Sequence, residues 1–340
     1  MILPQLTFFC ELNSDDLQEL FKDSAIIDGL RALNANLSLG LIDLSQERAE
    51  VVRRLNAAGI PLTAWLLLPE KDGYWFNLDN FPQALACYQS FREWTEEKGL
   101  KWSGVGLDIE PDIRDWGQWK TGRFRFINTL VKRAFNRKRL LRAQAAYTRL
   151  AATIRNDGYL VESYQFPFID DERKVGSSLL RRLAGLVDIP VDREVWMLYT
   201  SYFRPTGAGY LWSYAQQASA IGLGSTGGGV DTGVGDGQPL DWEEFSRDLR
   251  LAWYWTNDIY IFSLEGCARQ GFFERLKNFQ WDRPILFPDE VAEPVERWRQ
   301  ALRSALWVSH NALFIFVGTI TAVIIMRRLS GLLHRRAGKR

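Results

Sequence analysis

The chain has 340 residues, 46% of them hydrophobic, so it is long enough to bury one large core or two small ones. Its net charge is +1, but six basic and no acidic residues lie in the last fourteen positions, so residues 1–326 carry five more acidic than basic residues. A net negative charge over residues 1–326 does not suit binding to the negatively charged phosphate backbone, so nucleic acid is not an expected partner.

Eight apolar segments, each typical of a buried strand, follow one another along the chain. They are residues 2–12, 37–44, 60–68, 101–110, 159–168, 194–203, 219–226 and 258–266. Amphipathic segments between them have helical spacing, as in 45–59, 78–99 and 239–256. Gly59 is expected to end the first of these helices, and Asn80 and Asp241 to cap the starts of the other two.

Eight strand–helix units over about 280 residues predict a (β/α)8 TIM barrel, which we place at residues 1–290. The rival fold is a doubly wound open sheet. Such a sheet often begins with a glycine-rich phosphate turn after its first strand, whereas here "FFCELNSDD" stands at that point. The barrel is therefore the better interpretation.

The C-terminus predicts a single membrane anchor. Residues 305–326 carry no formal charge at neutral pH and are long enough to cross a bilayer as a transmembrane helix. We assign 291–304 as a juxtamembrane linker and 327–340 as a basic tail, so membrane lipid is an expected partner. The alternative is a buried core helix. The basic tail favours the cytoplasm and the N-terminus lacks a signal-peptide pattern, so the side of the membrane on which the barrel lies stays open.

The strand at 101–110 has two unlike faces. Val105, Leu107 and Ile109 form an apolar face, while two glycines, Asp108 and Glu110 form the other. Small residues followed by carboxylates fit a strand that lines a barrel, with its last residues at the mouth.

Chemistry on a TIM barrel lies at the carboxyl ends of the strands. The candidates there are carboxylates and tyrosines: Glu11, Asp108, Glu110, Glu162, Tyr164, Tyr199, Tyr202, Asp231 and Glu265. None is a histidine, which argues against a serine–histidine triad or a histidine-bound zinc. The three cysteines lack metal-ligand spacing, so neither a metal nor a cofactor is expected. Carboxylates with aromatic faces suit the cleavage of glycosidic bonds, which makes a carbohydrate the expected substrate.

Two motifs resemble the chitinase-like glycoside hydrolases of family 18. "LDIEP" is similar to the family's Asp-x-Glu signature, and "MLYT" (197–200) to its Met-x-Tyr-Asp. The resemblance implies that Glu110 is the general acid/base, Asp108 its partner and Tyr199 the hydroxyl that assists the substrate. The chain departs from the family at Ser103, Gly106 and Thr200, where the family has aspartates, and it shows no clear strand-eight tryptophan.

Two functional hypotheses follow from this pattern. In the first, the chain is a membrane-anchored glycosidase in which Glu162 or Glu265 supplies the second carboxylate, and Tyr164, Tyr202, Asp231 and Glu11 bind substrate. In the second, it is a catalytically inactive barrel that binds glycan or scaffolds a membrane complex. Under a purely structural interpretation, Asp108 pairs with an interior basic group and Glu110 caps a loop.

Overall fold

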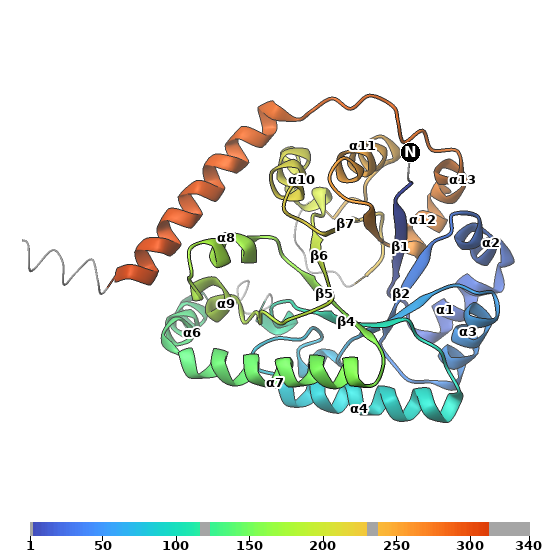
Figure 1. The fold of residues 1–340 in the computed structure, drawn as a ribbon, viewed down its shortest axis with the longest axis horizontal. Coiled ribbons are helices and arrows are strands. Elements are labelled where there is room, and N and C mark those ends of the chain that lie inside the picture. Colours follow the sequence, from blue (N-terminus) through green and yellow to red (C-terminus); the bar gives the residue numbers. More distant parts are fainter. Residues whose placement is uncertain (1–2, 116–122, 230–236, 313–340) are drawn as a thin grey trace, which may run out of the picture.

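The computed structural model describes residues 3–115, 123–229 and 237–312, except for the side chains of 123–127. Figure 1 shows a ring of strands with helices around it. The predicted barrel is confirmed: eight parallel strands pair in chain order, and β8 pairs with β1 to close the ring. The strands are β1 (Gln5–Cys10), β2 (Asn36–Leu41), β3 (Leu62–Leu66), β4 (Gly104–Asp108), β5 (Leu160–Gln165), β6 (Arg193–Met197), β7 (Ala220–Gly224) and β8 (Asp258–Phe262).

Helices connect the strands on the outside of the barrel. They are α1 (Ser14–Lys22), α2 (Ser24–Ala32), α3 (Gln46–Ala57), α4 (Phe81–Lys98), α6 (Arg123–Phe135), α7 (Arg137–Asn156), α8 (Phe168–Lys174), α9 (Leu179–Ala184), α10 (Gly207–Ala215), α11 (Trp242–Trp253), α12 (Leu264–Arg269) and α13 (Phe272–Lys277), with 3-10 turns η1 (Glu70–Asp72) and η2 (Thr200–Phe203).

The helix-start predictions hold to different degrees. Asp241 forms a full capping box with Glu244 at the start of α11. Asn80 occupies the N-cap position of α4, but its side chain bonds elsewhere, to the backbone of Asn77 and Trp75.

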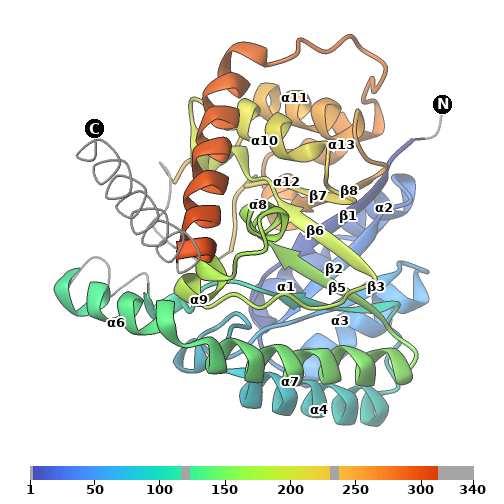
Figure 2. The same ribbon diagram turned by 60° about the vertical axis from the view of Figure 1, so that its left-hand side comes forward.

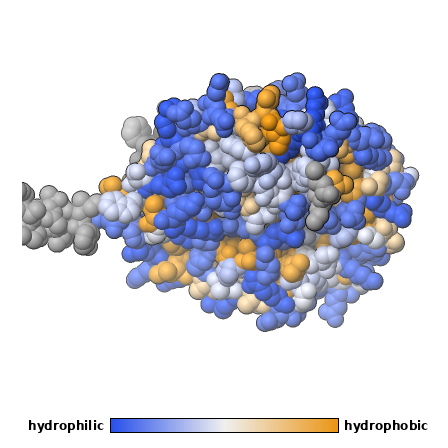
Figure 3. Space-filling model, turned by 45° about the horizontal axis from the view of Figure 1, so that its top comes forward, coloured by the Kyte–Doolittle hydropathy of each residue, from blue (hydrophilic) through white to orange (hydrophobic). Residues whose placement is uncertain are grey.

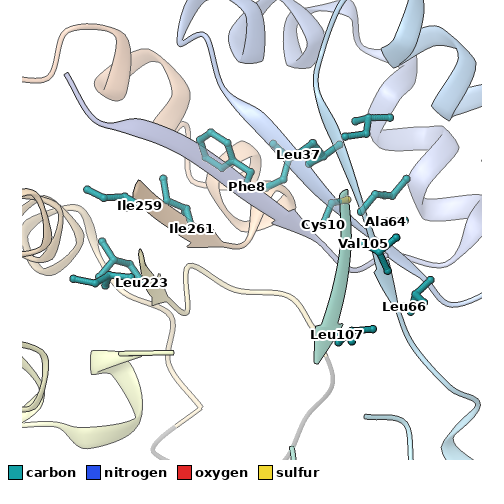
Figure 4. Packing of buried hydrophobic residues seen from close by; sticks show 14 of the residues in the cluster. Phe8, Cys10, Leu37, Ala64, Leu66, Val105, Leu107, Leu223, Ile259 and Ile261 are labelled. Atoms are coloured by element: carbon teal, nitrogen blue, oxygen red, sulfur yellow. The ribbon is translucent and has the colours of Figure 1, made fainter. Parts of the chain in front are cut away.

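The strands have two buried faces, as the sequence of β4 predicts. Outward-facing residues such as Phe8, Leu66, Val105 and Leu107 pack under the helices (Figure 4). Inward-facing residues form a separate, mostly aromatic cluster inside the barrel: Phe9, Trp65, Tyr74, Trp75, Tyr164, Val195, Met197, Ala220, Tyr260 and Phe262. The barrel interior is therefore filled by side chains and leaves room for chemistry only at its mouth.

Residues 289–312 form a long helix that lies beside α8 and α10 (Figure 2). We expected residues 291–304 to be a linker. They are instead part of a helix that is held against α8 and α10, where Arg299 inserts its buried guanidinium between Asp171 on α8 and the carbonyl of Ser213 on α10. A backbone carbonyl of the same helix lies so close to Gly209 on α10 that a side chain there would collide with it.

Within the described ranges, no helix is long and apolar enough to cross a membrane. Most of the predicted transmembrane segment, from residue 313 on, and all of the basic tail lie outside these ranges. The face of the molecule in Figure 3 is mostly hydrophilic, with hydrophobic residues in separate patches.

Candidate active site

A cavity of about 750 Å³ opens at the carboxyl ends of the strands. Its volume falls in the range of about 300–1,000 Å³ that is typical of small-molecule sites. Six of the predicted site residues line it: Glu11, Asp108, Glu110, Tyr164, Tyr199 and Tyr202. The other described lining residues are Phe9, Trp65, Trp75, Pro111, Phe166, Phe168, Ala184, Met197, Phe203, Thr206, Tyr210, Tyr214, Phe262, Pro294, Val295 and Trp298.

Asp108 and Glu110 form a carboxyl pair in the cavity. Asp108 ends β4 and is buried, and its Oδ2 accepts a hydrogen bond from Trp65 Nε1 at 3.1 Å. The two carboxyl groups lie close enough for each to affect the proton affinity of the other. Burial, together with the negative charge of Glu11, raises the pKa of Glu110 to about 8. Burial and the neighbouring carboxylates raise the pKa of Asp108 well above its usual range, so the pair keeps a proton at neutral pH.

This arrangement does not fit the purely structural interpretation, in which Asp108 pairs with an interior basic group. Among the described residues that line the cavity there is no lysine, arginine or histidine. The electrostatic environment of the pair is therefore set by burial and by carboxylates, which is the environment that keeps a glutamic acid protonated.

Glu11 supplies a third carboxylate from the end of β1, which β2 and β3 separate from β4. It directly follows β1 and accepts a hydrogen bond from the hydroxyl of Tyr74. Tyr74 is buried and has a φ of 62°, in the left-handed region that a bulky residue rarely adopts. The hydrogen bond to Glu11 and an edge contact with Trp75, at 5.4 Å between ring centroids, hold it there.

Tyr199 follows β6 and places its ring over Phe262 at the end of β8. The two rings stack at 5.6 Å between centroids, and Tyr202 contacts Tyr199 edge-on. Burial and the nearby charge of Asp108 raise the pKa of Tyr199 well above its usual range, so its hydroxyl keeps its proton. Phe262 thus places an aromatic ring at the carboxyl end of β8, inside the cavity.

Tyr164 accounts for the glycine at position 106, where the family 18 pattern has an aspartate. Its ring lies directly against Gly106, and a Cβ at that position would collide with the Tyr164 hydroxyl. That hydroxyl is paired with Ser38 at 2.7 Å and also donates to Glu162 at 3.2 Å. The space that an aspartate side chain at position 106 would need is therefore occupied, and the Tyr164 ring forms part of the cavity floor.

Glu162 does not line the cavity, although we expected it to face the substrate. Its carboxylate lies deeper in the barrel, 3.1 Å from Arg193 Nη1, and accepts a hydrogen bond from Tyr260 at 2.9 Å. It is therefore the carboxylate that pairs with an interior basic group.

Glu265 and Asp231 are the remaining two candidates. Glu265 lies in the first turn of α12, buried and outside the cavity lining, and a side chain at Gly228 would collide with its carboxyl group. Asp231 lies outside the described residues.

Several residues of the candidate site carry no signal in the sequence. Trp65 and Tyr74 contact the carboxylates, and only folding shows which of the many aromatic residues do so. Val295 and Trp298 line the cavity from helix 289–312, far along the chain from the barrel strands. The described residues contain no cluster of histidine, cysteine, aspartate and glutamate arranged to hold a metal ion.

Neither a protein-family model nor a curated protein sequence matches the chain. Among solved structures, it resembles a family 18 (GH18) chitinase from Pseudoalteromonas aurantia, with 10% identity, a TM-score of 0.48, and coverage of 81% of this chain and 100% of the other. It also resembles a xylose isomerase domain containing protein from Salmonella typhimurium, with 10% identity, a TM-score of 0.41, and 91% and 99% coverage. A Rhizomucor miehei beta-1,3-glucanosyltransferase has 10% identity, a TM-score of 0.34, and 76% and 86% coverage. At these identities and TM-scores the likenesses carry no argument about activity. The fold and the cavity define a TIM barrel with a carboxylate-based candidate site.

Proposed function

We propose that this chain cleaves glycosidic bonds, with Glu110 as the general acid. The observation that carries the proposal is the Asp108–Glu110 pair, which keeps a proton at neutral pH inside a cavity lined by aromatic rings. A glycosidase needs a carboxylic acid with a raised pKa to protonate the leaving oxygen. Without a basic residue on the described cavity lining, a neutral glycan is a better substrate than an acidic one.

In this proposal Glu11 is the second carboxylate. As Glu110 gives its proton to the glycosidic oxygen and the bond to the anomeric carbon breaks, Glu11 either bonds to that carbon or takes a proton from an attacking water. Asp108 shares the proton of the pair with Glu110, and Tyr199 presents a neutral hydroxyl to the sugar. The anomeric configuration of the first product, read by NMR, tells the two roles of Glu11 apart.

The test uses the full-length chain on a panel of neutral polysaccharides and oligosaccharides. Glu110→Gln should lower turnover by about 10² to 10⁴-fold, since an amide cannot donate the proton, while substrate binding is retained. The matched control is Glu70→Gln, an exposed carboxylate in η1 that does not line the cavity. Full activity in Glu110→Gln would show that the acid is another residue.

A glycan-binding barrel without catalysis is the second candidate function. It is favoured by the space at Gly106, which Tyr164 fills, and by the aromatic cavity lining. Binding of a glycan by the wild type, with no cleavage of any member of the panel, would select this function.

We further propose that residues 305–326 anchor the protein in a membrane as a single C-terminal span. The support is the absence of formal charge over these residues and the basic residues that follow. Fractionation of cells that express the full-length chain, with a carbonate wash, tests the anchor.

A further inference from the structure

One side of the cavity is formed by helices rather than by the barrel. We call it the helical wall, and it consists of Phe168, Ala184, Tyr202, Phe203, Thr206, Tyr210, Tyr214, Pro294, Val295 and Trp298. None of these residues is charged. The carboxylates of the cavity all follow or end barrel strands, so the described part of the cavity has one acidic region and one apolar region.

The side chains of the helical wall offer a sugar few hydrogen-bond partners besides the hydroxyls of Tyr202, Thr206, Tyr210 and Tyr214. Sugar hydroxyls need hydrogen-bond partners, and a buried hydroxyl left without one costs free energy. The hydroxyl of Tyr214 donates to Asp171 at 2.7 Å, which is not a cavity residue. Pro294 and Val295 offer only aliphatic surface to the cavity.

The aromatic rings of the helical wall also stack on each other. Phe168 is stacked on Phe166 at 5.3 Å between centroids, and Phe203 on Tyr210 at 4.0 Å. Phe168, Phe203 and Tyr210 therefore each have one ring face covered by another ring and expose apolar carbon on the rest. Methylene groups can pack against the exposed ring carbons and edges of such a surface without a fixed orientation.

The helical wall is preformed because helix 289–312 is fixed to the barrel. Arg299, next to Trp298, is buried and lies 3.1 Å from Asp171 Oδ1, with its guanidinium 3.8 Å from the centre of the Tyr214 ring. The same helix leads directly into the uncharged segment 305–326. The apolar side of the cavity and the proposed membrane anchor thus belong to one continuous stretch of chain.

We infer that the substrate is a neutral glycoside with an alkyl chain: the sugar lies at the carboxylates and the alkyl chain lies against the helical wall. This inference rests on the proposed function for the sugar end only. Burial of apolar surface determines how the alkyl chain of the ligand binds. Binding of alkyl glycosides can therefore be measured whether or not the protein cleaves the glycosidic bond.

The experiment compares methyl, hexyl and octyl glycosides of glucose, galactose, mannose and N-acetylglucosamine. Binding to the full-length chain, held in detergent-free lipid nanodiscs, is measured by calorimetry below the micelle concentration, with empty nanodiscs subtracted. Affinity should rise by up to about fourfold for each methylene that the cavity buries, so octyl should exceed methyl by at least about tenfold for one sugar. Equal affinity for methyl and octyl glycosides of every sugar would overturn the inference.

Two tryptophans of the same helix provide a matched control. Trp298 is 54% exposed and lines the cavity, whereas Trp307 is 51% exposed and does not. Trp298→Ala should lower octyl glycoside affinity several-fold and leave methyl glycoside affinity unchanged, and Trp307→Ala should change neither. Val295→Thr, which keeps the shape of the side chain, should act in the same direction as Trp298→Ala. An equal loss in Trp298→Ala and Trp307→Ala would place the alkyl chain outside the cavity and overturn the inference.

The same experiments test the glycosidase proposal separately from the alkyl site. Chain-length-dependent binding without cleavage would support the alkyl site and contradict the glycosidase proposal. Cleavage of unsubstituted glycans with no preference for alkyl glycosides would support the glycosidase and contradict the alkyl site.

Discussion

Arg299 and Asp171 form a buried ion pair although 128 residues separate them in the sequence. Their side chains are 2% and 0% exposed, and Arg299 Nη2 lies 3.1 Å from Asp171 Oδ1. Tyr214 adds a hydrogen bond to the same carboxylate and a ring face to the guanidinium. This cluster ties helix 289–312 to α8 and α10, and so holds one side of the cavity in place.

The first prediction concerns this ion pair. Arg299→Met should lower the free energy of unfolding by about 3 kcal/mol, because it leaves the buried Asp171 carboxylate without its closest cation. Arg297→Met removes an arginine of the same helix whose ion pair with Glu293 is exposed, and should change stability by less than about 0.5 kcal/mol. Urea unfolding of both variants gives the comparison, and equal effects would mean that the helix is not held by Arg299.

The second prediction is the alkaline limit of activity. Turnover requires the proton of Glu110, so kcat/KM should fall as the pH rises through about 8. The negative charge of Glu11 helps to raise this pKa, and Glu11→Gln should therefore move the fall to lower pH, whatever its effect on the maximal rate. Glu70→Gln should leave the profile in place. A profile that Glu11→Gln does not shift would place the two carboxylates too far apart to interact.

The third prediction uses stability and needs no substrate. Folding raises the pKa of Glu110 from 4.5 to about 8, so the folded state binds the proton more tightly than the unfolded state. The free energy of unfolding should therefore fall as the pH rises between these two values, by on the order of a few kcal/mol. Glu110→Gln should flatten this decline. The raised pKa of Asp108 should account for part of the pH dependence that remains. Parallel stability curves for the two proteins between pH 5 and pH 9 would contradict the raised pKa.

The fourth prediction concerns truncation. A chain ending at residue 312 keeps the whole described helix, including the buried Leu306, and should be folded and absent from the membrane fraction. A chain ending at residue 288 loses Arg299 and Arg303, the two arginines that pair with Asp171, so it should melt at a lower temperature. Membrane fractionation and thermal unfolding separate the two effects.

The sequence alone determined the barrel and the position of the Asp108–Glu110 carboxyl pair. Eight apolar segments in alternation with amphipathic ones predict the fold, since strand and helix periodicities are local properties of the chain. The alternation of glycines and carboxylates in β4 likewise showed that Asp108 and Glu110 share the inner face, because neighbouring side chains on a strand point to opposite sides.

Only the tertiary structure decided which other groups meet this pair. Glu11, Glu162 and Glu265 are equivalent as sequence signals, each a glutamate within or just beyond a predicted strand. Barrel closure and side-chain packing place Glu11 in the cavity, pair Glu162 with Arg193 and bury Glu265 against Gly228. The apolar side of the cavity depends on the contact between Arg299 and Asp171, and such a long-range pairing leaves no periodic pattern in the sequence, because it is determined by how whole helices pack.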